Sequence, residues 1–161
     1  MASTSTLQRE IRQRRPFSSP AHESVVALLR TADLVRRHAT ALLDGHGITL
    51  QQFNVLRILR GAGDAGLPTL EVAERMIEQT PGVTRLLDRL EAKGLVRRQR
   101  CPKDRRQHLC WITDEGLEVL AGLDEPVQKA NQESLKGLGA RDQRELVRLL
   151  DLVRAAHHET P

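Results

Sequence analysis

Aromatic residues are scarce in this chain of 161 residues, which has two Phe, one Trp and no Tyr. β-Sandwiches and barrels depend on aromatic and β-branched residues, so this shortage favours a helical protein packed with Leu, Val and Ala. The length fits one domain with a core of ordinary size. The composition therefore predicts a mainly α-helical protein with one domain.

Cysteines and long apolar runs are also scarce. Cys101 and Cys110 lack the number and spacing of a disulfide scaffold or a zinc site, and no two of the six histidines are spaced to share a helix face as metal ligands. We expect no metal and no other cofactor. The longest apolar run, 25–29, is far shorter than the roughly 20 residues that span a bilayer. No apolar segment near residue 1 resembles a secretion signal, so we expect a cytoplasmic protein with no membrane partner.

Catalytic patterns are missing too. The sequence has no Gly-rich phosphate loop, no nucleophile elbow and no paired carboxylates in a recognisable frame, so we do not expect an enzyme. Basic residues instead point to a polyanionic partner, since the net charge is +4 and the isoelectric point is near 9.7. One basic cluster, with Arg9, Arg12, Arg14 and Arg15, lies in a leader at 1–21 that we expect to be flexible. The other, at 96–106, has six basic residues and one acid.

Apolar residues recur at helical spacing near both ends of the chain. One such segment covers 25–43 and ends near 45–47, and another covers 146–153 after a glycine-containing break at 137–139. The helix between Thr113 and this break contains Pro126, which we expect to kink or interrupt it. The apolar faces are wider than a small monomer covers, so we predict that 22–46 and 114–158 supply the helices of a homodimer.

A helix-turn-helix is predicted between these segments. Thr49 and Gln52 have the spacing of a capping box, and Thr69 is the expected N-cap of a short helix. The next helix is expected to start at Thr80-Pro81 and to end at Gly94. Its inward residues are Val83, Leu86, Leu87 and Leu90. Two helices joined by a tight turn form a helix-turn-helix, which by itself is a weak signal of function.

A β-hairpin is predicted after Gly94, where the helical period stops and the segments 95–100 and 107–113 flank a polar tip. Residues opposite each other should have numbers that sum to about 208. This register puts Cys110 opposite Arg98 and Cys101 near Gln107. The two cysteines are therefore not cross-strand neighbours, and a disulfide between them would require distortion.

Three stretches of this sequence closely resemble the signature of the MarR family of bacterial regulators. They are residues 83–96, Asp104-Arg105-Arg106, and 111–116 with its Thr-x-x-Gly spacing, and the similarity spans roughly 23–157. The resemblance implies a winged helix-turn-helix domain over 22–158, with a DNA-reading head at 48–113 and dimerisation helices on either side. The departures are the long basic leader and Cys101, where the family often has Asp or Asn.

Candidate DNA contacts follow from the helix that this resemblance assigns to the major groove. Its outward face contains Asp88 and residues suited to base or phosphate contact, namely Thr80, Pro81, Gly82, Thr84, Arg85 and Arg89. In the wing, Arg105 and Arg106 are expected in the minor groove, and Arg97, Arg98 and Lys103 at phosphates. By resemblance, Asp104 would brace an Arg at the tip. The plainer alternatives are a solvated helix face and a charged turn.

The sequence thus predicts a transcription regulator that binds double-stranded DNA, and specifically a repressor released from a palindromic operator by a small molecule. The resemblance implies a small aromatic or phenolic effector. Candidates to line its cavity are His22, Arg36, Arg37, His38 and Phe53, although each of these is more commonly a packing or surface residue.

Two alternative functions stay open. In the first, Cys101 is oxidised and disturbs the wing, because nearby Arg residues would raise its reactivity. The plainer interpretation is that Cys101 is inert and Cys110 is a small buried apolar residue. In the second, the winged helix binds another protein and the basic hairpin only keeps its surface soluble.

Overall fold

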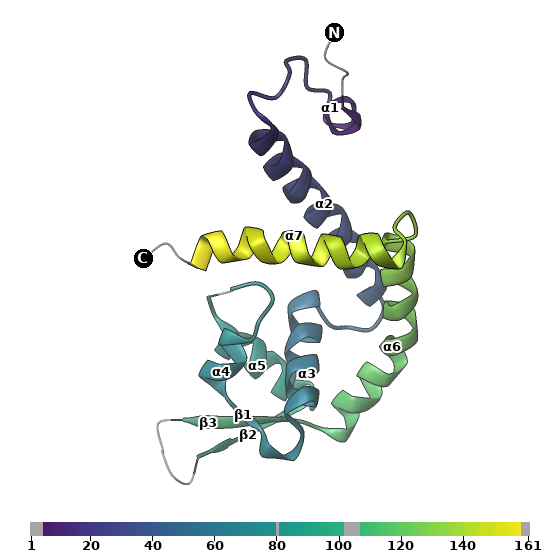
Figure 1. Ribbon diagram of the computed structural model, residues 1–161. Helices are drawn as coiled ribbons and strands as arrows, with labels where there is room; N and C mark the ends of the chain where they lie inside the picture. The colour runs from purple at the N-terminus through teal and green to yellow at the C-terminus, as the bar shows by residue number, and fades with distance from the viewer. Residues whose placement is uncertain (1–4, 80, 102–106, 159–161) are drawn as a thin grey trace. The chain divides into compact units, whose positions relative to one another are not determined.

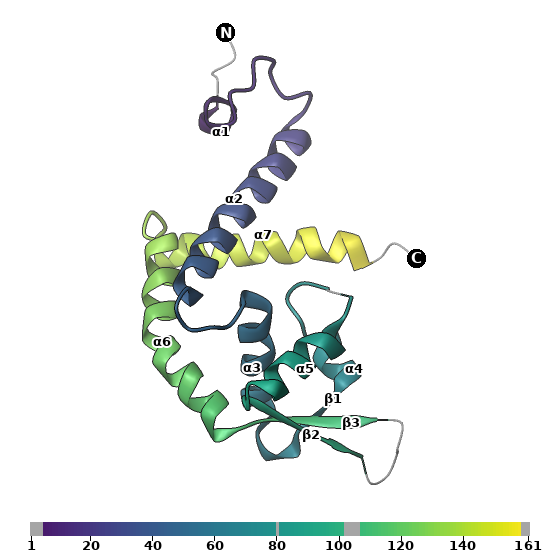
Figure 2. The ribbon, with the colours of Figure 1, turned by 180° about the vertical axis from the view of Figure 1, so that it is seen from behind.

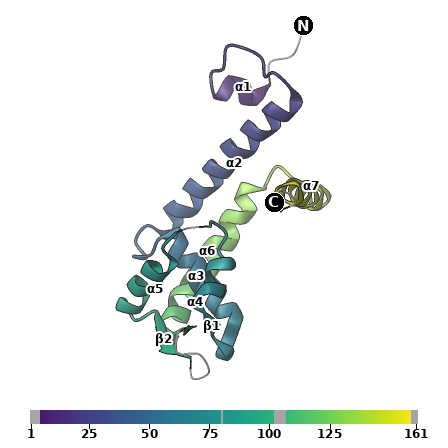
Figure 3. The same cartoon turned by 90° about the vertical axis from the view of Figure 1, so that its left-hand side faces the viewer.

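The computed structural model describes residues 5–79, 81–101 and 107–158. The chain divides into two units, Met1–Leu42 and Leu43–Pro161. In the first unit, a short helix within the basic leader, α1 (Thr6–Glu10), is capped by the Ser5 side chain. The long helix α2 (Pro20–Leu43) follows, and Figure 3 shows it as one unbroken helix.

The second unit contains a helix-turn-helix, a β-hairpin and two further helices (Figure 1). The elements of this unit are α3 (Leu50–Ala62), a 3-10 turn η1 (Gly63–Ala65), β1 (Leu67–Pro68), α4 (Thr69–Glu74), α5 (Val83–Ala92), β2 (Val96–Arg100), β3 (His108–Ile112), α6 (Asp114–Ser134) and α7 (Ala140–His158). The three strands form one antiparallel sheet in the order β1-β3-β2. Figures 1 and 2 show α3, α4 and α5 on the same side of this sheet. A mainly helical fold with a small β wing is therefore confirmed.

The core of the second unit is built from leucines of its helices and from the inner face of the hairpin. Its largest fully buried side chains are Val55, Leu56, Leu59, Val72, Leu87, Leu90, Val96, Cys110, Leu120 and Leu123. The four residues predicted to point inward from α5 are all buried. Apolar spacing along α5 thus determined which face packs and which face stays in solvent.

Several local predictions are confirmed by hydrogen bonds. Thr49 Oγ1 accepts from the Gln52 amide at 3.2 Å while Gln52 Oε1 accepts from the Thr49 amide at 3.1 Å, which completes the capping box. Gly94 has φ +72°, and the next amide reaches back to the carbonyl of Leu90 at 3.0 Å. In the hairpin, Arg98 pairs with Cys110 as the predicted register requires.

Two boundary predictions are wrong. Pro68, not Thr69, occupies the N-cap position of α4, and its side chain has no acceptor for a capping hydrogen bond. The Thr69 hydroxyl is directed to β3 instead. The helix α5 begins at Val83 after Gly82 with φ +102°, so Pro81 lies in the preceding turn. Of the two outcomes expected at Pro126, only the interruption is contradicted, because α6 is continuous through this residue. The strand β1, which was not predicted, pairs Leu67 with Cys110.

Among the described helices, none combines the length and the apolar character needed to cross a membrane. The described residues also contain no cluster of His, Cys, Asp and Glu side chains that could hold a metal ion.

Candidate nucleic-acid interface

The outward face of α5 is basic and accessible. Thr84, Arg85 and Arg89 are exposed, while the opposite face of the same helix is buried in the core. Within the described part of the chain, neither Arg85 nor Arg89 forms an ion pair. Within the described residues no carboxylate neutralises either guanidinium group, and a helix of this width fits the DNA major groove. Gly82, at the N-cap, adds a position without a side chain where a backbone can approach closely.

Arg97 and Arg98 are neighbours in β2, yet they point to opposite faces of the sheet because side chains alternate along a strand. The Arg97 guanidinium lies 4.1 Å from the ring centre of Trp111, its cross-strand partner. The indole is itself fixed, because its Nε1 donates to the Asp64 carbonyl at 3.0 Å. Arg97 stays exposed, so this cation–π contact orients a cation that remains accessible to solvent.

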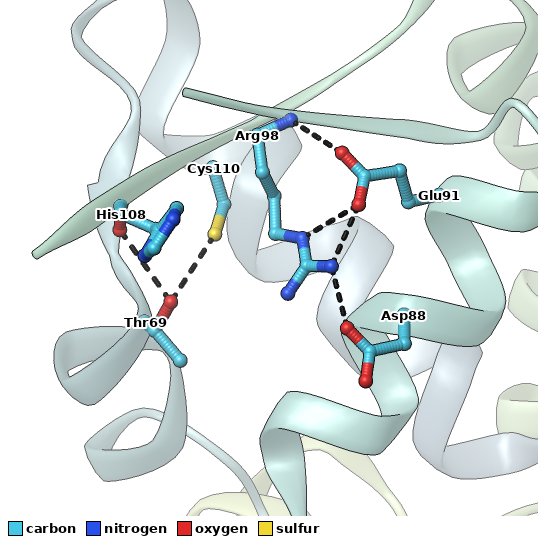
Figure 4. A network of polar contacts seen from close by, with 6 residues as sticks. All are labelled: Thr69, Asp88, Glu91, Arg98, His108 and Cys110. Carbon is cyan, nitrogen blue, oxygen red and sulfur yellow. Dashed lines mark hydrogen bonds and ion pairs between the residues drawn. The ribbon is translucent and has the colours of Figure 1, made fainter. Parts of the chain in front are cut away.

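Arg98 points toward α5 and is occupied there (Figure 4). Its Nε and Nη2 donate to Glu91 Oε2 at 2.9 and 2.6 Å, and Nη2 also donates to Asp88 Oδ1 at 2.5 Å. Burial alone would lower the pKa of Arg98, but the hydrogen bonds to Glu91 and Asp88 outweigh it and the pKa is raised. This geometry argues against the expectation that Arg98 contacts phosphate, because its guanidinium already serves two carboxylates.

The remaining predicted DNA contacts lie outside the described residues. They are Thr80 before α5, and Lys103, Arg105 and Arg106 at the predicted tip of the wing. Asp104, which was predicted to brace an Arg at this tip, also lies outside the described residues. Their roles stay predictions.

The residues predicted to line an effector cavity belong to both units. His22 Nδ1 lies 3.0 Å from Ser18 Oγ, and Arg37 forms an ion pair with Asp33. Phe53 is buried in the core of the second unit, whereas His22, Arg36, Arg37 and His38 belong to the first. The second unit has an open cavity of about 550 Å3 that none of the five residues lines. Its lining residues are Leu43, Asp44, Gly45, Gly47, Ile48, Thr49, Gln52, Arg89, Ala92 and Lys93.

The two cysteines are free thiols in different surroundings. Cys110 is fully buried, and burial raises the pKa of its thiol, which keeps it protonated and unreactive. Cys101 is half-buried, and its amide donates to the Gln107 carbonyl at 2.9 Å, as the predicted register places it.

Sequence reasoning missed the carboxylates that hold Arg98. Asp88 and Glu91 are three residues apart and so share one side of α5. Strand alternation would have put Arg97 and Arg98 on opposite faces, and only one of them can then face that acidic side. The signal was present in these two periodicities taken together.

A helix-turn-helix followed by a basic β-hairpin defines a winged helix, an architecture that binds DNA. The family model described as the MarR family matches residues 48–108. The crystal structure of a MarR transcription factor from Planctomyces limnophilus is 37% identical to this chain, with a TM-score of 0.66, and the match covers 85% of this chain and 99% of that one. The chain therefore belongs to the MarR family and is a DNA-binding transcription regulator.

Two further solved structures are similar over most of their length. Sco3205, a MarR family transcriptional regulator from Streptomyces coelicolor in complex with DNA, is 26% identical with a TM-score of 0.76, over 92% of this chain and 94% of that one. The PcaV transcriptional regulator from the same organism, in complex with its natural ligand, is 27% identical with a TM-score of 0.66, over 89% and 95% of the two chains.

Proposed function

We propose that this protein binds a palindromic operator as a homodimer in the cytoplasm and represses transcription until a small molecule releases it. The observation that carries the DNA-binding part is the exposed face of α5, where Arg85 and Arg89 have no ion-pair partner among the described residues. The Sco3205 complex, a relative bound to DNA, supports the same use of this architecture.

The dimer is supported by apolar side chains that the chain leaves in solvent. Those that are more than half exposed on α2 and α7 are Val25, Leu29, Val147 and Leu152. Patches of this kind mark protein interfaces, and a second copy of the chain is the partner that a symmetric dimer requires. Two-fold symmetry would present two copies of α5 to half-sites about one helical turn apart.

Selection of bound sequences from random DNA tests the operator. We expect the selected sites to contain an inverted repeat, and sites without a dyad would contradict the proposed dimer on DNA.

Arg85→Ala tests base reading by α5. We expect it to weaken binding to the selected site by about 1–3 kcal/mol and to relax the preference at one position in each half-site. Arg141→Ala, in the first turn of α7, removes the same charge from an exposed residue away from α5 and is the control. Equal losses in the two variants would contradict a reading role for Arg85.

Release by a small molecule is the second part of the proposal, and PcaV, a relative bound to its natural ligand, supports it. A panel of aromatic and phenolic acids is added to the complex while fluorescence anisotropy of labelled operator is recorded. We expect at least one acid to lower the affinity at saturating concentration. No effect of any member would contradict a phenolic effector.

The same assay separates the two alternative functions. If Cys101 controls the wing, peroxide treatment weakens binding by the wild type and not by Cys101→Ser. If the winged helix serves only to bind a protein, no sequence-specific complex forms, and residual DNA binding lacks the steep salt dependence that counterion release gives.

A further inference from the structure

Arg98 and Cys110 form the cross-strand pair at which the wing meets both helices of the helix-turn-helix (Figure 4). On the Arg98 side, α5 supplies Asp88 and Glu91. On the Cys110 side, Thr69 at the start of α4 places its Oγ1 3.6 Å from the Cys110 sulfur and 3.4 Å from the His108 carbonyl oxygen. This cross-strand pair of the hairpin thus contacts both α4 and α5.

Glu91 holds both the backbone and the side chain of Arg98. Its Oε1 accepts from the Arg98 amide at 3.1 Å, while its Oε2 accepts from Nε and Nη2. A carboxylate that binds a strand amide fixes the position of the strand as well as the direction of the side chain. The position of β2 relative to α5 therefore depends on Glu91 and Arg98.

This ion pair differs from the others on the surface. The Arg98 side chain is 17% exposed, whereas Arg37, paired within α2, and Arg148, paired within α7, are 61% and 56% exposed. Because the Arg98 side chain is largely shielded, solvent and salt screen its pair with Glu91 less than they screen a pair between two exposed side chains.

The charge of the cluster also argues against a phosphate contact. Two carboxylates and one guanidinium leave a net charge of −1, which does not attract DNA phosphate. Moving the Arg98 guanidinium to a phosphate would leave Glu91 and Asp88 without their partner close to a polyanion.

We propose that Arg98 is a positioning residue for DNA binding, which holds the wing at a fixed place against the recognition helix α5 so that both elements meet DNA together. The proposal rests on the proposed function, in which α5 and the wing contact DNA. Arg98 acts through the wing and through Glu91, and does not itself touch DNA.

Glu91→Gln distinguishes a positioning role of Arg98 from a phosphate contact, because the two roles predict opposite changes in the affinity for the operator. If Arg98 positions the wing, this variant binds the selected operator roughly tenfold more weakly, although it removes a negative charge near DNA. If Arg98 contacts phosphate, the same variant frees the guanidinium and reduces repulsion, so it binds more tightly. Glu118→Gln, which removes an exposed acid on α6, is the matched control and is expected to leave affinity unchanged within about twofold.

A double-mutant cycle and a footprint add readouts that a loss of stability alone would not give. Arg98→Gln and Glu91→Gln together should weaken binding no more than either alone. Hydroxyl-radical protection of the minor groove beyond each half-site should be lost, while methylation interference at the guanines read by α5 is kept. Uniform loss of both signals, or additive losses in the double variant, would overturn the positioning role.

Thermal unfolding by circular dichroism establishes that each variant is folded at the assay temperature. If Glu91→Gln is not folded there, Asp88→Asn replaces it, because the Asp88 side chain is 53% exposed and makes a single hydrogen bond to Arg98. We expect Asp88→Asn also to weaken binding to the selected operator, but by less than Glu91→Gln. Unchanged or tighter binding would overturn the proposal. Absence of any sequence-specific complex with the wild type would instead contradict the proposed function itself.

Discussion

The helix-turn-helix and the long helices α2 and α7 use their apolar residues in opposite ways. In α3 and α5, Val55, Leu56, Leu87 and Leu90 are completely buried. In α2 and α7, Leu29 and Leu152 are 66% and 58% exposed. The head therefore completes its core within one chain, whereas the apolar residues of α2 and α7 still need a partner surface. We infer that DNA reading is a property of the single chain and that its symmetry comes from association.

The largest effect on stability is expected from a substitution in the buried core of the head. Leu87→Ala should lower the free energy of unfolding by about 2–5 kcal/mol, because it removes a buried side chain and leaves a cavity on the inner face of α5. Urea unfolding followed by circular dichroism measures it. A loss below 1 kcal/mol would mean that the head is packed more loosely than its burial indicates.

A structural feature could be predicted from the sequence when it depends on residues that are close together in the chain. The capping box at Thr49, the inward face of α5 and the hairpin register follow from fixed spacings within one or two elements, and all three were predicted correctly. The two-residue strand β1 was missed because it exists only through pairing with β3, which lies over 40 residues later.

The candidate site was less predictable than the fold, for a related reason. Arg97 and Arg98 have the same charge and are adjacent in the sequence, but their neighbours in space give them different roles. Arg97 stacks on Trp111, while Arg98 is held by acids of α5. Likewise, the Thr69 hydroxyl was predicted to cap its own helix but instead contacts β3. Composition identifies the charge, and tertiary contacts decide what it does.

The junction between wing and α6 provides the second prediction. A Cβ on Gly116 would lie 2.4 Å from the Leu95 carbonyl oxygen and 2.7 Å from Ile112 Cγ1, so a side chain has no room there. Gly116→Ala should therefore destabilise the head by about 1–3 kcal/mol. Gly122→Ala in the same helix is the control, because nothing lies within 4 Å of its Cβ position. The control should be neutral or slightly stabilising, and similar losses in both variants would contradict a steric cause.

The third prediction concerns the exposed apolar residues of α7. Leu152→Ala should weaken dimerisation by about 1–2 kcal/mol per copy, through lost apolar burial at the proposed interface. Sedimentation equilibrium should give twice 18.1 kDa for the wild type at micromolar concentration and a larger fraction of monomer for the variant. The unfolding midpoint should depend on protein concentration. A monomeric wild type would show that α2 and α7 have another partner.

The smallest effect is expected at an exposed pair that joins the head to α6. Arg60 Nη1 donates to Asp124 Oδ2 at 2.8 Å and to Oδ1 at 3.1 Å, and Nη2 donates to Oδ1 at 3.1 Å. These hydrogen bonds, followed by the positive charges of Arg60 and Arg57, lower the pKa of Asp124. A carboxylate whose pKa is lower in the folded state contributes stability above its unfolded pKa, near 3.9, and loses it as pH falls through the folded pKa.

Asp124→Asn should therefore lower the free energy of unfolding at pH 7 by at most about 1 kcal/mol, since solvent screens a pair of which the Asp side chain is 53% exposed. The difference from the wild type should shrink as pH falls below about 4 and through the lowered folded-state pKa of Asp124, and it should vanish once Asp124 is protonated in both states. It should also shrink in 1 M salt. Glu118 forms no ion pair within the described residues, so Glu118→Gln should show no such pH dependence. A difference that persists at low pH would mean that Asn disturbs packing between α3 and α6, so that this contact belongs to the closed core and not to the exposed surface.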